Sequence, residues 1–530
     1  MPKLTIDGRE IEVAAGTTVI RAAQQLGIDI PHFCWHPDLS VDGNCRMCVV
    51  EIEKQAKLQI SCNTAATEGL VVHTDTPRVR AARRSTLEFL LVNHPIDCPV
   101  CDQAGECYLQ DQYQAYTLHD ARTELEEKVH KRKLADLGPI LLDAERCVLC
   151  SRCLRFESEV VGTSTLMFAN RGNRTEIATF QNRPITHSYA GNLADVCPVG
   201  ALLSHDFRFK MRVWFLASTP SICPGCSTGC NVYVDQRDGE IYRLRPRRNP
   251  EVNKAWLCDP GRAQYKQIGS PERVAVARTR RGAEWSAVPL AAALDVLAAH
   301  IKGAGRALAI LGTPQATNED LRALSTLADT TGARLDFRVG DPELKVRELE
   351  DGILQRADKN PNTQGALDLG IARSGVDEII AACRRGEVAV LLLQGPELLR
   401  LPAAGVFLEK VPFVAVMATH NEPALERAHL ILPAAAWAEI DGTFTNYQRR
   451  VQRILRAVPA PGEARPRWDL VGALLRRLGA PLAATSAREL FGEVVRAVPE
   501  YAGLDYRVLG ESGRVAISVG ANGHSPLPQV

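Results

Sequence analysis

The sequence lacks an apolar run long enough to cross a membrane. Its most apolar stretches, residues 388–393 and 430–438, are far shorter than the roughly 20 residues of a transmembrane helix. The N-terminal segment Met-Pro-Lys-Leu-Thr-Ile-Asp-Gly also lacks the apolar core of a signal peptide. We therefore expect a soluble protein, so any contact with a membrane would go through a partner.

The sequence also lacks an excess of charge and the common nucleotide-binding motifs. Its 63 Lys and Arg residues balance 62 Asp and Glu residues, which excludes a strong field for nucleic acid or an anionic membrane. It contains no G-x-G-x-x-G and no G-x-x-x-x-G-K-[ST] motif. No acid–base pair or nucleophile triad can be recognised, so we expect functional residues that are ligands rather than catalysts. A length of 530 residues predicts several domains.

Cysteine is almost missing from the second half of the chain, where only Cys383 occurs. The other fifteen cysteines precede residue 260 and fall into groups of four, three, four and four. Disulfides suit small secreted frameworks, which this chain does not resemble. The grouping therefore predicts metal cages, and Cys383 is expected to be a packed thiol on a helix.

The first group is spaced C-x10-C-x2-C-x13-C and follows a predicted hairpin (residues 3–6 and 10–13) and a predicted helix (17–26). Its members are Cys34, Cys45, Cys48 and Cys62. This arrangement resembles the β-grasp fold of [2Fe–2S] ferredoxins, with ten residues where the plant type has four. Gly43 and Asn44 precede the central pair, where backbone amides could point at the sulfurs. A zinc site is the alternative for this group taken alone.

The second group is spaced H-x3-C-x2-C-x5-C, with prolines that stiffen its turns and Gly105 that lets the backbone curl. Its members are His94, Cys98, Cys101 and Cys107. One zinc ion could bind these four ligands, but the neighbouring groups favour an iron–sulfur cluster. Helices are expected at residues 83–92 and 108–116, and a solvated, charged connector at residues 123–133.

The third group is Cys147-x2-Cys150-x2-Cys153 with a distant Cys197-Pro198. In the two-cluster ferredoxin run C-x2-C-x2-C-x3-C-P, the fourth cysteine of each run binds the cluster of the other run. The ligands of one cluster are all replaced here, and the replaced positions are Glu157, His187, Ala190 and Leu193. The other cluster keeps its four cysteines, so we expect one surviving [4Fe–4S] cluster of two.

The fourth group, Cys223, Cys226, Cys230 and Cys258, resembles the N-terminal cluster motif of molybdopterin oxidoreductases. A hairpin is expected between residues 232–234 and 241–244. From about residue 270, strands (307–311, 334–337, 388–394 and 413–417) alternate with helices (318–329, capped by Asn318, and 376–385, with Ser374 as a possible cap), which predicts a largely parallel α/β sheet.

The segment from residue 430 to residue 452 also resembles molybdopterin oxidoreductases, where a turn rich in Gly, Thr and Asn lies near the pterin. That family places a Lys two residues after the last cluster cysteine, where this chain has Pro260, and no metal-ligating residue is evident. We therefore expect no molybdenum and a domain that is a truncated structural relic. Helices are predicted at residues 468–478 and 487–497, and a mobile end after Gly510.

These groups in this order, with Asp136-Leu-Gly-Pro before Glu145-Arg-Cys147, resemble the large iron–sulfur subunit (the G subunit) of bacterial NADH-quinone oxidoreductase, respiratory complex I. The resemblance is dense over residues 1–272 and loose beyond, and the chain is shorter than most bacterial members. It implies one [2Fe–2S] and three [4Fe–4S] clusters that relay electrons from a flavin subunit toward quinone. It also implies partners in the peripheral arm: the NADH-binding flavin subunit, a [2Fe–2S] subunit and the subunits that connect to the quinone site. The expected location is the cytoplasmic side of the inner (plasma) membrane.

The predicted fold class is multidomain, with α+β and α/β parts. The expected domains are a β-grasp [2Fe–2S] domain (1–78), a [4Fe–4S] domain with one His and three Cys ligands (79–122), a ferredoxin-like domain with one cluster (138–215), a molybdopterin-oxidoreductase-type [4Fe–4S] domain (216–272), an inactive α/β domain (273–458) and a helical, flexible tail (459–530).

Three other families share part of the pattern. The molybdenum subunit of an NAD-linked formate dehydrogenase needs the missing Lys and metal ligand. An iron-only hydrogenase needs both ferredoxin runs and a cysteine-rich catalytic domain. The diaphorase subunit of an NAD-reducing hydrogenase should end soon after Cys197. A zinc scaffold without redox function is the remaining alternative.

Overall fold

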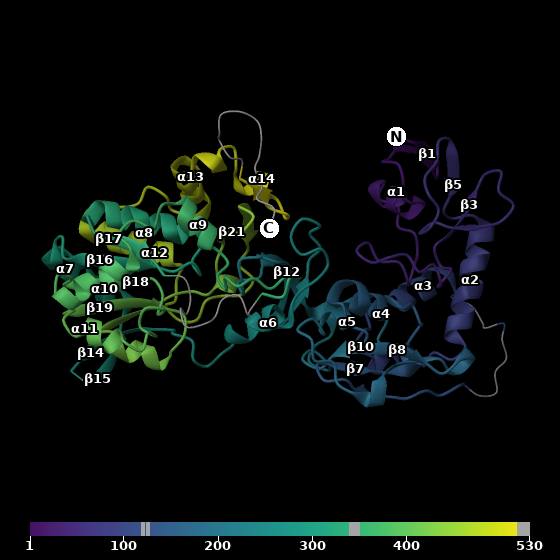
Figure 1. The fold of residues 1–530 in the computed structure, drawn as a ribbon, viewed down its shortest axis with the longest axis horizontal. Helices are drawn as coiled ribbons and strands as arrows, with labels where there is room; N and C mark the ends of the chain where they lie inside the picture. The colour runs from purple at the N-terminus through teal and green to yellow at the C-terminus, as the bar shows by residue number, and fades with distance from the viewer. Residues whose placement is uncertain (118–121, 123–127, 283, 339–349, 517–530) are drawn as a thin grey trace. The chain divides into compact units, whose positions relative to one another are not determined.

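The computed structural model describes residues 1–117, 122, 128–282, 284–338 and 350–516. The chain forms two compact units, residues 1–216 and 217–530, which Figure 1 colours from purple to blue and from teal to yellow. Each unit has its own sheets and buried core. Within the described ranges, no helix is both long and apolar enough to span a bilayer.

The first unit opens with a five-stranded sheet in the order β2-β1-β5-β3-β4. Its strands are β1 (Lys3–Ile6), β2 (Arg9–Glu12), β3 (Val49–Ile52), β4 (Gln59–Ile60) and β5 (Leu70–His73). Helix α1 (Val19–Gln25) buries Val19, Ile20, Ala22 and Ala23 in the core that also holds Leu4 and Ile6. The predicted hairpin and helix are confirmed to within two residues, and mixed pairing around β1 gives the expected β-grasp arrangement.

Helix α2 (Pro77–Leu91) is longer than the predicted helix because it begins at an N-terminal cap that precedes the apolar pattern. The Thr76 side chain accepts a hydrogen bond from the Val79 amide, and Pro77 stands in the first turn, where proline is tolerated. The fully buried Arg83 donates to the carbonyls of Met47 and Val49, which ties α2 to the β-grasp sheet. Helix α3 (Tyr108–Tyr116) lies where it was predicted.

The rest of the first unit is a small α+β arrangement around the third cysteine group. Strands β10, β7 and β6 form one sheet and β8 and β9 another: β6 (Ala135–Asp136), β7 (Ile140–Leu142), β8 (Leu166–Ala169), β9 (Glu176–Thr179) and β10 (Leu202–Ser204). Helix α4 (Arg152–Phe156) includes Cys153, and helix α5 (Asn192–Val196) ends immediately before Cys197. The two short helices therefore place cysteines that are far apart in sequence.

The predicted connector at residues 123–133 lies partly outside the described residues. Its described part is not a solvated linker. The Lys128 ammonium donates to the His94 carbonyl, the Val129 amide donates to the Asn93 side chain, and Lys131 donates to the Thr175 carbonyl. This segment therefore packs against the second cysteine group. Its charged composition had indicated a solvated linker and did not reveal this packing.

The second unit begins with the three-stranded sheet β11 (Ala217–Ile222), β12 (Asn231–Arg237) and β13 (Glu240–Pro246), followed by α6 (Asp259–Arg262). The predicted hairpin is β12 and β13. The fourth cysteine group brackets this sheet, because Cys223 follows β11, Cys230 precedes β12 and Cys258 precedes α6.

A seven-stranded sheet in the order β15-β14-β20-β19-β18-β16-β17 forms the centre of the second unit. Strands β16 to β20 pair in parallel, while β14 and β15 form an antiparallel edge, which confirms the predicted α/β class. The strands are β14 (Ala277–Arg281), β15 (Glu284–Val288), β16 (Leu308–Gly312), β17 (Arg334–Phe337), β18 (Val390–Leu393), β19 (Phe413–Ala418) and β20 (Leu430–Pro433).

Helices cover both faces of this sheet. Alternate residues of the strands point to opposite sides, so Leu308 and Ile310 join one buried cluster while Ala309 and Leu311 join the other. The first cluster contains α7 (Leu290–Ala304), α8 (Asn318–Thr331), α12 (Arg467–Leu478) and α13 (Ala487–Ala497), and the second contains α10 (Val376–Arg385) and α11 (Ala404–Leu408). Figure 1 shows α8 and α12 side by side over the sheet.

Two predicted helix caps are wrong. Helix α8 is capped by Thr317, whose side chain accepts from the Asp320 amide while Asp320 accepts from the Thr317 amide. Asn318 is therefore the first helical residue. Helix α10 follows Gly375, and the Ser374 hydroxyl accepts a hydrogen bond from the Leu335 amide instead of capping the helix.

The segment predicted as a tail is part of the core. Helices α12 and α13 contribute Leu474, Leu475 and Phe491 to the buried cluster, and α14 (Tyr506–Leu509) adds Leu509. Strand β23 (Arg514–Val515) pairs with β22 (Arg450–Ile454), which pairs with β21 (Gly442–Thr445). Helix α9 (Thr363–Asp368) contacts β21. The predicted mobile end lies outside the described residues from residue 517 on.

Candidate metal cages

The four sulfurs of the first group converge in the loop beside the β-grasp sheet. The Cys34 and Cys45 side chains hydrogen-bond to each other, as do those of Cys48 and Cys62. The hydrogen bond from its partner thiol lowers the pKa of Cys45 to about 7, and the equivalent bond lowers the pKa of Cys48 to about 7. Backbone amides of Phe33 and Gly43 point at the Cys45 and Cys34 sulfurs, as was expected for Gly43. The same bonds raise the pKa of the partner thiols, Cys34 and Cys62, so one thiol of each pair becomes more acidic and the other less acidic.

The second group joins three thiols with a half-buried imidazole. Burial raises the pKa of Cys101 and raises that of Cys107 to about 11. Burial lowers the pKa of His94 to about 4, so its ring is neutral at pH 7 and can offer a nitrogen lone pair to a metal. Among the described residues, no hydrogen bond between the His94 ring and the three thiols is present, so its place in this ligand set stays a prediction.

Gly200 leaves room for a sulfur of the second group. A Cβ atom at this position would lie 2.3 Å from Cys101 Sγ and 3.2 Å from the Gln103 Cβ. The Gly200 φ angle is not in the left-handed region, so the close approach alone explains why a glycine fits here. Sequence spacing did not reveal this residue, because it lies far along the chain from Cys101.

The four thiols of the third group line a single small cavity with apolar side chains such as Leu142, Ile177 and Val199. Burial raises the pKa of Cys147 to about 12 and that of Cys150 to about 11. The Leu149 amide donates to Cys147 Sγ over 3.4 Å. An apolar cavity lined by four cysteines suits an iron–sulfur cluster, because bound metal would hold the thiolates that burial otherwise disfavours.

Two of the four positions of the replaced second ferredoxin cluster, Glu157 and His187, lie in contact. Glu157 is fully buried, accepts a hydrogen bond from the Leu166 amide and contacts the His187 ring at 3.4 Å. Ala190 and Leu193 are fully buried as well. A polar pair and two apolar side chains thus stand where the sequence comparison places four missing cysteines.

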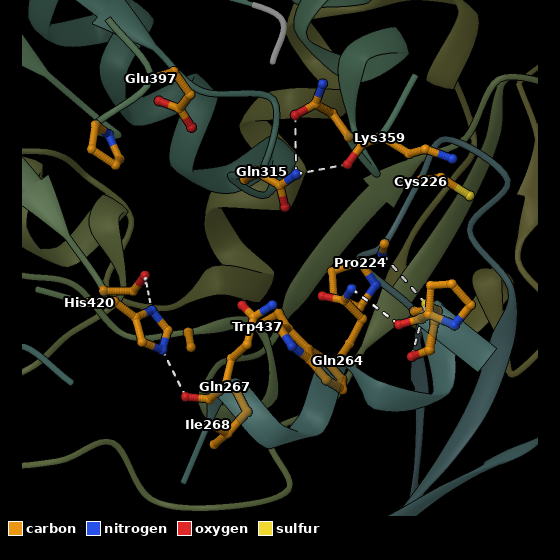
Figure 2. Close-up of a pocket in the computed structure, with 18 of the residues that line it drawn as sticks. Pro224, Cys226, Gln264, Gln267, Ile268, Gln315, Lys359, Glu397, His420 and Trp437 are labelled. Carbon is orange, nitrogen blue, oxygen red and sulfur yellow. Dashed lines mark hydrogen bonds between the residues drawn. The ribbon is translucent and has the colours of Figure 1, made fainter. Parts of the chain in front are cut away.

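All four thiols of the fourth group line one pocket of about 580 Å³ in the second unit. Figure 2 shows Pro224 and Cys226 on one side of it, with Gln264 and Trp437 below and His420 and Glu397 opposite. The Gly261 amide donates to Cys258 Sγ over 3.3 Å. A Cβ atom at Gly261 would lie 3.1 Å from that sulfur and 3.2 Å from Cys223 Sγ, so glycine keeps the space between the two sulfurs open.

Pro260 and several polar side chains line the walls of this pocket. Gln315 donates to the Lys359 carbonyl and the Asn360 side chain, and His420 bridges Thr419 and the Gln267 carbonyl (Figure 2). Cys383 is fully buried on α10 in the apolar core, away from the pocket, as expected.

The turn that follows β21 packs against the fourth group. The Asn446 side chain donates to the Thr228 carbonyl, and the Tyr447 amide donates to the Ser227 carbonyl. This turn therefore holds the loop between Cys226 and Cys230.

The first three groups share one buried apolar core. Its members include Phe33, Met47, Leu109 and Val199 together with cysteines of all three groups: Cys34, Cys45, Cys107, Cys147, Cys150 and Cys197. All three groups therefore border the same apolar core.

Hydrogen bonds connect the third group to each of the other two. The Arg155 guanidinium donates to the Cys34 carbonyl of the first group and the Cys150 carbonyl of the third. On the other side, the Tyr108 amide donates over 3.0 Å to the Pro198 carbonyl. Since Tyr108 follows Cys107 and Pro198 follows Cys197, this bond joins the second group to the third. Sequence reasoning missed Arg155, although it lies two residues after Cys153.

Within the part of the chain that the structure describes, no three His, Cys, Asp or Glu side chains form a site for a single metal ion. The sixteen predicted ligands therefore remain predictions, which rest on their spacing, on the convergence of their sulfurs and on the amides directed at them.

Five family descriptions match consecutive parts of the chain. They are a 2Fe-2S iron-sulfur cluster binding domain (2–77), the NADH-ubiquinone oxidoreductase-G iron-sulfur binding region (83–122), the NADH-quinone oxidoreductase subunit 3 ferredoxin-like domain (138–203), the molybdopterin oxidoreductase Fe4S4 domain (216–270) and molybdopterin oxidoreductase (285–477). The order of domain types in the predicted fold class is thereby confirmed.

Two curated relatives show how far the similarity extends. The G subunit of NADH-quinone oxidoreductase from Streptomyces coelicolor is 36% identical over 83% of this chain and 53% of its own length. The mitochondrial NADH dehydrogenase [ubiquinone] iron-sulfur protein 1 of Solanum tuberosum is 31% identical over 95% of this chain and 84% of its own length. The chain spans about half the length of the Streptomyces relative. A crystal structure of an NAD+-reducing [NiFe]-hydrogenase shares 31% identity over 40% of this chain and 91% of its own, with a TM-score of 0.37.

Proposed function

Because the chain belongs to the family that comprises the G subunits of NADH-quinone oxidoreductases and their mitochondrial counterparts, we propose that it is an iron–sulfur relay subunit of an NADH:quinone oxidoreductase. The chain carries 2Fe–2S and 4Fe–4S binding domains. In this role it would pass electrons from an NADH-oxidising flavin subunit toward the quinone site. No independent substrate site is proposed in this chain.

The proposed ligands are the four groups. Cys34, Cys45, Cys48 and Cys62 would hold one [2Fe–2S] cluster. Three [4Fe–4S] clusters would be held by His94, Cys98, Cys101 and Cys107, by Cys147, Cys150, Cys153 and Cys197, and by Cys223, Cys226, Cys230 and Cys258. The fit is supported by the glycines at positions 200 and 261, which leave space beside sulfurs, and by the cysteine-lined cavity of the third group. When bound, each cluster would carry one electron at a time with little rearrangement.

One observation carries this proposal: the first three groups lie in a single apolar core and are joined by direct hydrogen bonds. The third group contacts both of the others, through Arg155 on one side and Pro198 on the other. We therefore place the third group between the first and the second in the relay. A series of this kind is what electron transfer requires, because tunnelling weakens steeply with distance.

The surrounding residues would keep water away from the clusters and stabilise the thiolate form of their cysteine ligands. Phe33, Met47 and Leu109 exclude water from the shared core. Amides directed at the cysteine sulfurs, such as that of Leu149, stabilise the thiolate form. Hydrogen bonds to sulfur and low solvent exposure are also the means by which a protein sets the reduction potential of a cluster.

The proposed partners are those of the peripheral arm: the NADH-binding flavin subunit, a [2Fe–2S] subunit and the subunits that connect to the quinone site. The curated relatives are named as parts of NADH-quinone oxidoreductase and NADH dehydrogenase, which supports a multisubunit setting. We propose a peripheral position on the cytoplasmic side of the inner (plasma) membrane, with membrane contact through those partners.

The test is electron paramagnetic resonance of the assembled complex. NADH should produce the signals of reduced clusters assigned to this chain, and a quinone added afterwards should remove them. A complex in which NADH reduces the flavin but leaves these clusters oxidised would contradict the relay function.

A further inference from the structure

Arg152 is the first residue of α4 and lies between two of the predicted cages. Its side chain is only 3% exposed. Its Nη2 group donates to the Trp35 carbonyl over 2.6 Å, and its Nη1 group donates to the Val196 carbonyl over 3.3 Å. Trp35 follows Cys34 of the first group, and Val196 precedes Cys197 of the third. A single buried guanidinium thus holds both ligand loops.

The charge of Arg152 is not neutralised by a carboxylate. In the described ranges no ion pair joins Arg152 to Asp or Glu, and its two carbonyl acceptors are uncharged. The ring of Tyr108 lies 5.4 Å from the guanidinium carbon, which adds only a weak cation–π contact. A buried cation without a counter-ion is costly, and such a group calls for an anion nearby.

The Nε–H group of Arg152 has no acceptor among the described residues. A buried donor without a partner costs about 1–3 kcal/mol, so native proteins rarely leave one unsatisfied without a reason. Arg152 directly precedes Cys153 in the chain, and its Nη1 group binds the carbonyl of the residue before Cys197, so the thiolates of the third group are anionic candidates beside it.

Two other buried arginines in this unit are satisfied by protein groups. Arg146 pairs with Asp97 and Asp143 beside the second group. Arg83 is 1% exposed and donates to the Met47 and Val49 carbonyls and the Tyr116 hydroxyl. Arg152 differs from both because it combines a charge that no described carboxylate compensates with an unsatisfied donor, on the helix that carries Cys153 of the third group.

We propose that Arg152 is a positioning residue that supplies the compensating positive charge of the third cage and raises its reduction potential. This inference rests on the proposed function, since it requires a cluster bound by Cys147, Cys150, Cys153 and Cys197. Positive charge close to a cluster favours its reduced, more negative state. The two carbonyl contacts keep that charge between the first and third cages.

The test measures the midpoint potentials of the first and third clusters in the assembled complex, by redox titration with electron paramagnetic resonance. Arg152→Gln, which removes the charge, should lower the potential of the third cluster while iron content stays at the wild-type level. Arg152→Lys, which keeps the charge, should restore most of that potential. Arg83→Gln is the matched control: it removes a buried arginine with neutral partners and should leave the third cluster unchanged.

A third-cluster potential in Arg152→Gln equal to that of the wild type would overturn the proposal. If Arg152→Gln fails to retain iron, Arg152→Lys decides: a wild-type potential supports the charge, and a lowered potential overturns it. An equal drop in Arg83→Gln would show a general structural effect and would also overturn it. Absence of any third-cluster signal from the wild-type complex would instead refute the proposed function.

Discussion

At the scale of single residues, the first prediction concerns His94, the proposed fourth ligand of the second cage. Replacing neutral imidazole by thiolate adds one negative charge, and His ligands raise the potential of Rieske centres relative to Cys ligands. His94→Cys should therefore retain the second cluster and lower its midpoint potential in a redox titration. An unchanged potential and spectrum would mean that another residue is the fourth ligand. A second prediction at this scale concerns Gly200. In Gly200→Ala the new methyl group would lie 2.3 Å from Cys101 Sγ, far inside van der Waals contact. We expect loss of iron from the second cage, measured as iron per chain and as loss of its resonance signal. Gly303→Ala is the control, since nothing lies within 4 Å of a Cβ atom there and α7 accepts alanine. Full iron content in Gly200→Ala would contradict the described geometry. The spacing of cysteines suggested the four groups, and in the structure the thiols of the third group line one cavity and those of the fourth line another. The cysteine spacing could not identify Gly200 or Arg152, because their roles depend on contacts with residues far away in the chain. Ligand spacing is local information, whereas room and charge around a ligand depend on tertiary structure.

At the scale of elements, each helix and strand predicted from the sequence occurs in the structure because its local signals agree with the fold, whereas others, such as β14 and α7, were not predicted. Strand β17 and helices α3, α10 and α13 begin and end at the predicted residues. The start of α2 was missed because the Thr76–Pro77 signal precedes the apolar pattern that was used to find the helix. The packing of α12 and α13 into the core was missed because it depends on α8, which lies far earlier in the chain. That packing can be tested on α12. Leu474 is fully buried between α12 and the helices of the same sheet face, so Leu474→Ala should destabilise the second unit by about 2–5 kcal/mol. Arg476→Ala, an exposed position on the same helix, should change stability by less than about 0.5 kcal/mol. Denaturant unfolding monitored by circular dichroism compares the two. Equal stability of both variants would show that this helix is a peripheral tail.

At the scale of the whole molecule, the chain combines a unit with three linked cysteine groups and a unit whose single cysteine group lines a pocket of about 580 Å³. The fourth group opens a domain that resembles molybdopterin oxidoreductases but carries Pro260 in place of the linking lysine. No downstream acceptor is expected there. We therefore propose that the fourth cage is mainly structural and adds metal-binding free energy to folding. This division of roles predicts opposite outcomes for two substitutions. Cys150→Ala should abolish NADH-to-quinone activity even in complexes that assemble, because it removes a ligand from the linked series. Cys226→Ala should reduce assembly or stability more than it reduces activity per assembled complex. The measurement is quinone reductase activity normalised to assembled complex. Complete loss of normalised activity in Cys226→Ala, with assembly intact, would place the fourth cage on the main electron path.

The central claim is that this chain holds one [2Fe–2S] and three [4Fe–4S] clusters, and metal and sulfide quantitation of the purified native chain tests it most directly. The account predicts about fourteen iron atoms per chain with an equal amount of acid-labile sulfide, and no stoichiometric molybdenum. About four zinc ions per chain without acid-labile sulfide would contradict it, because the four groups would then be structural zinc sites.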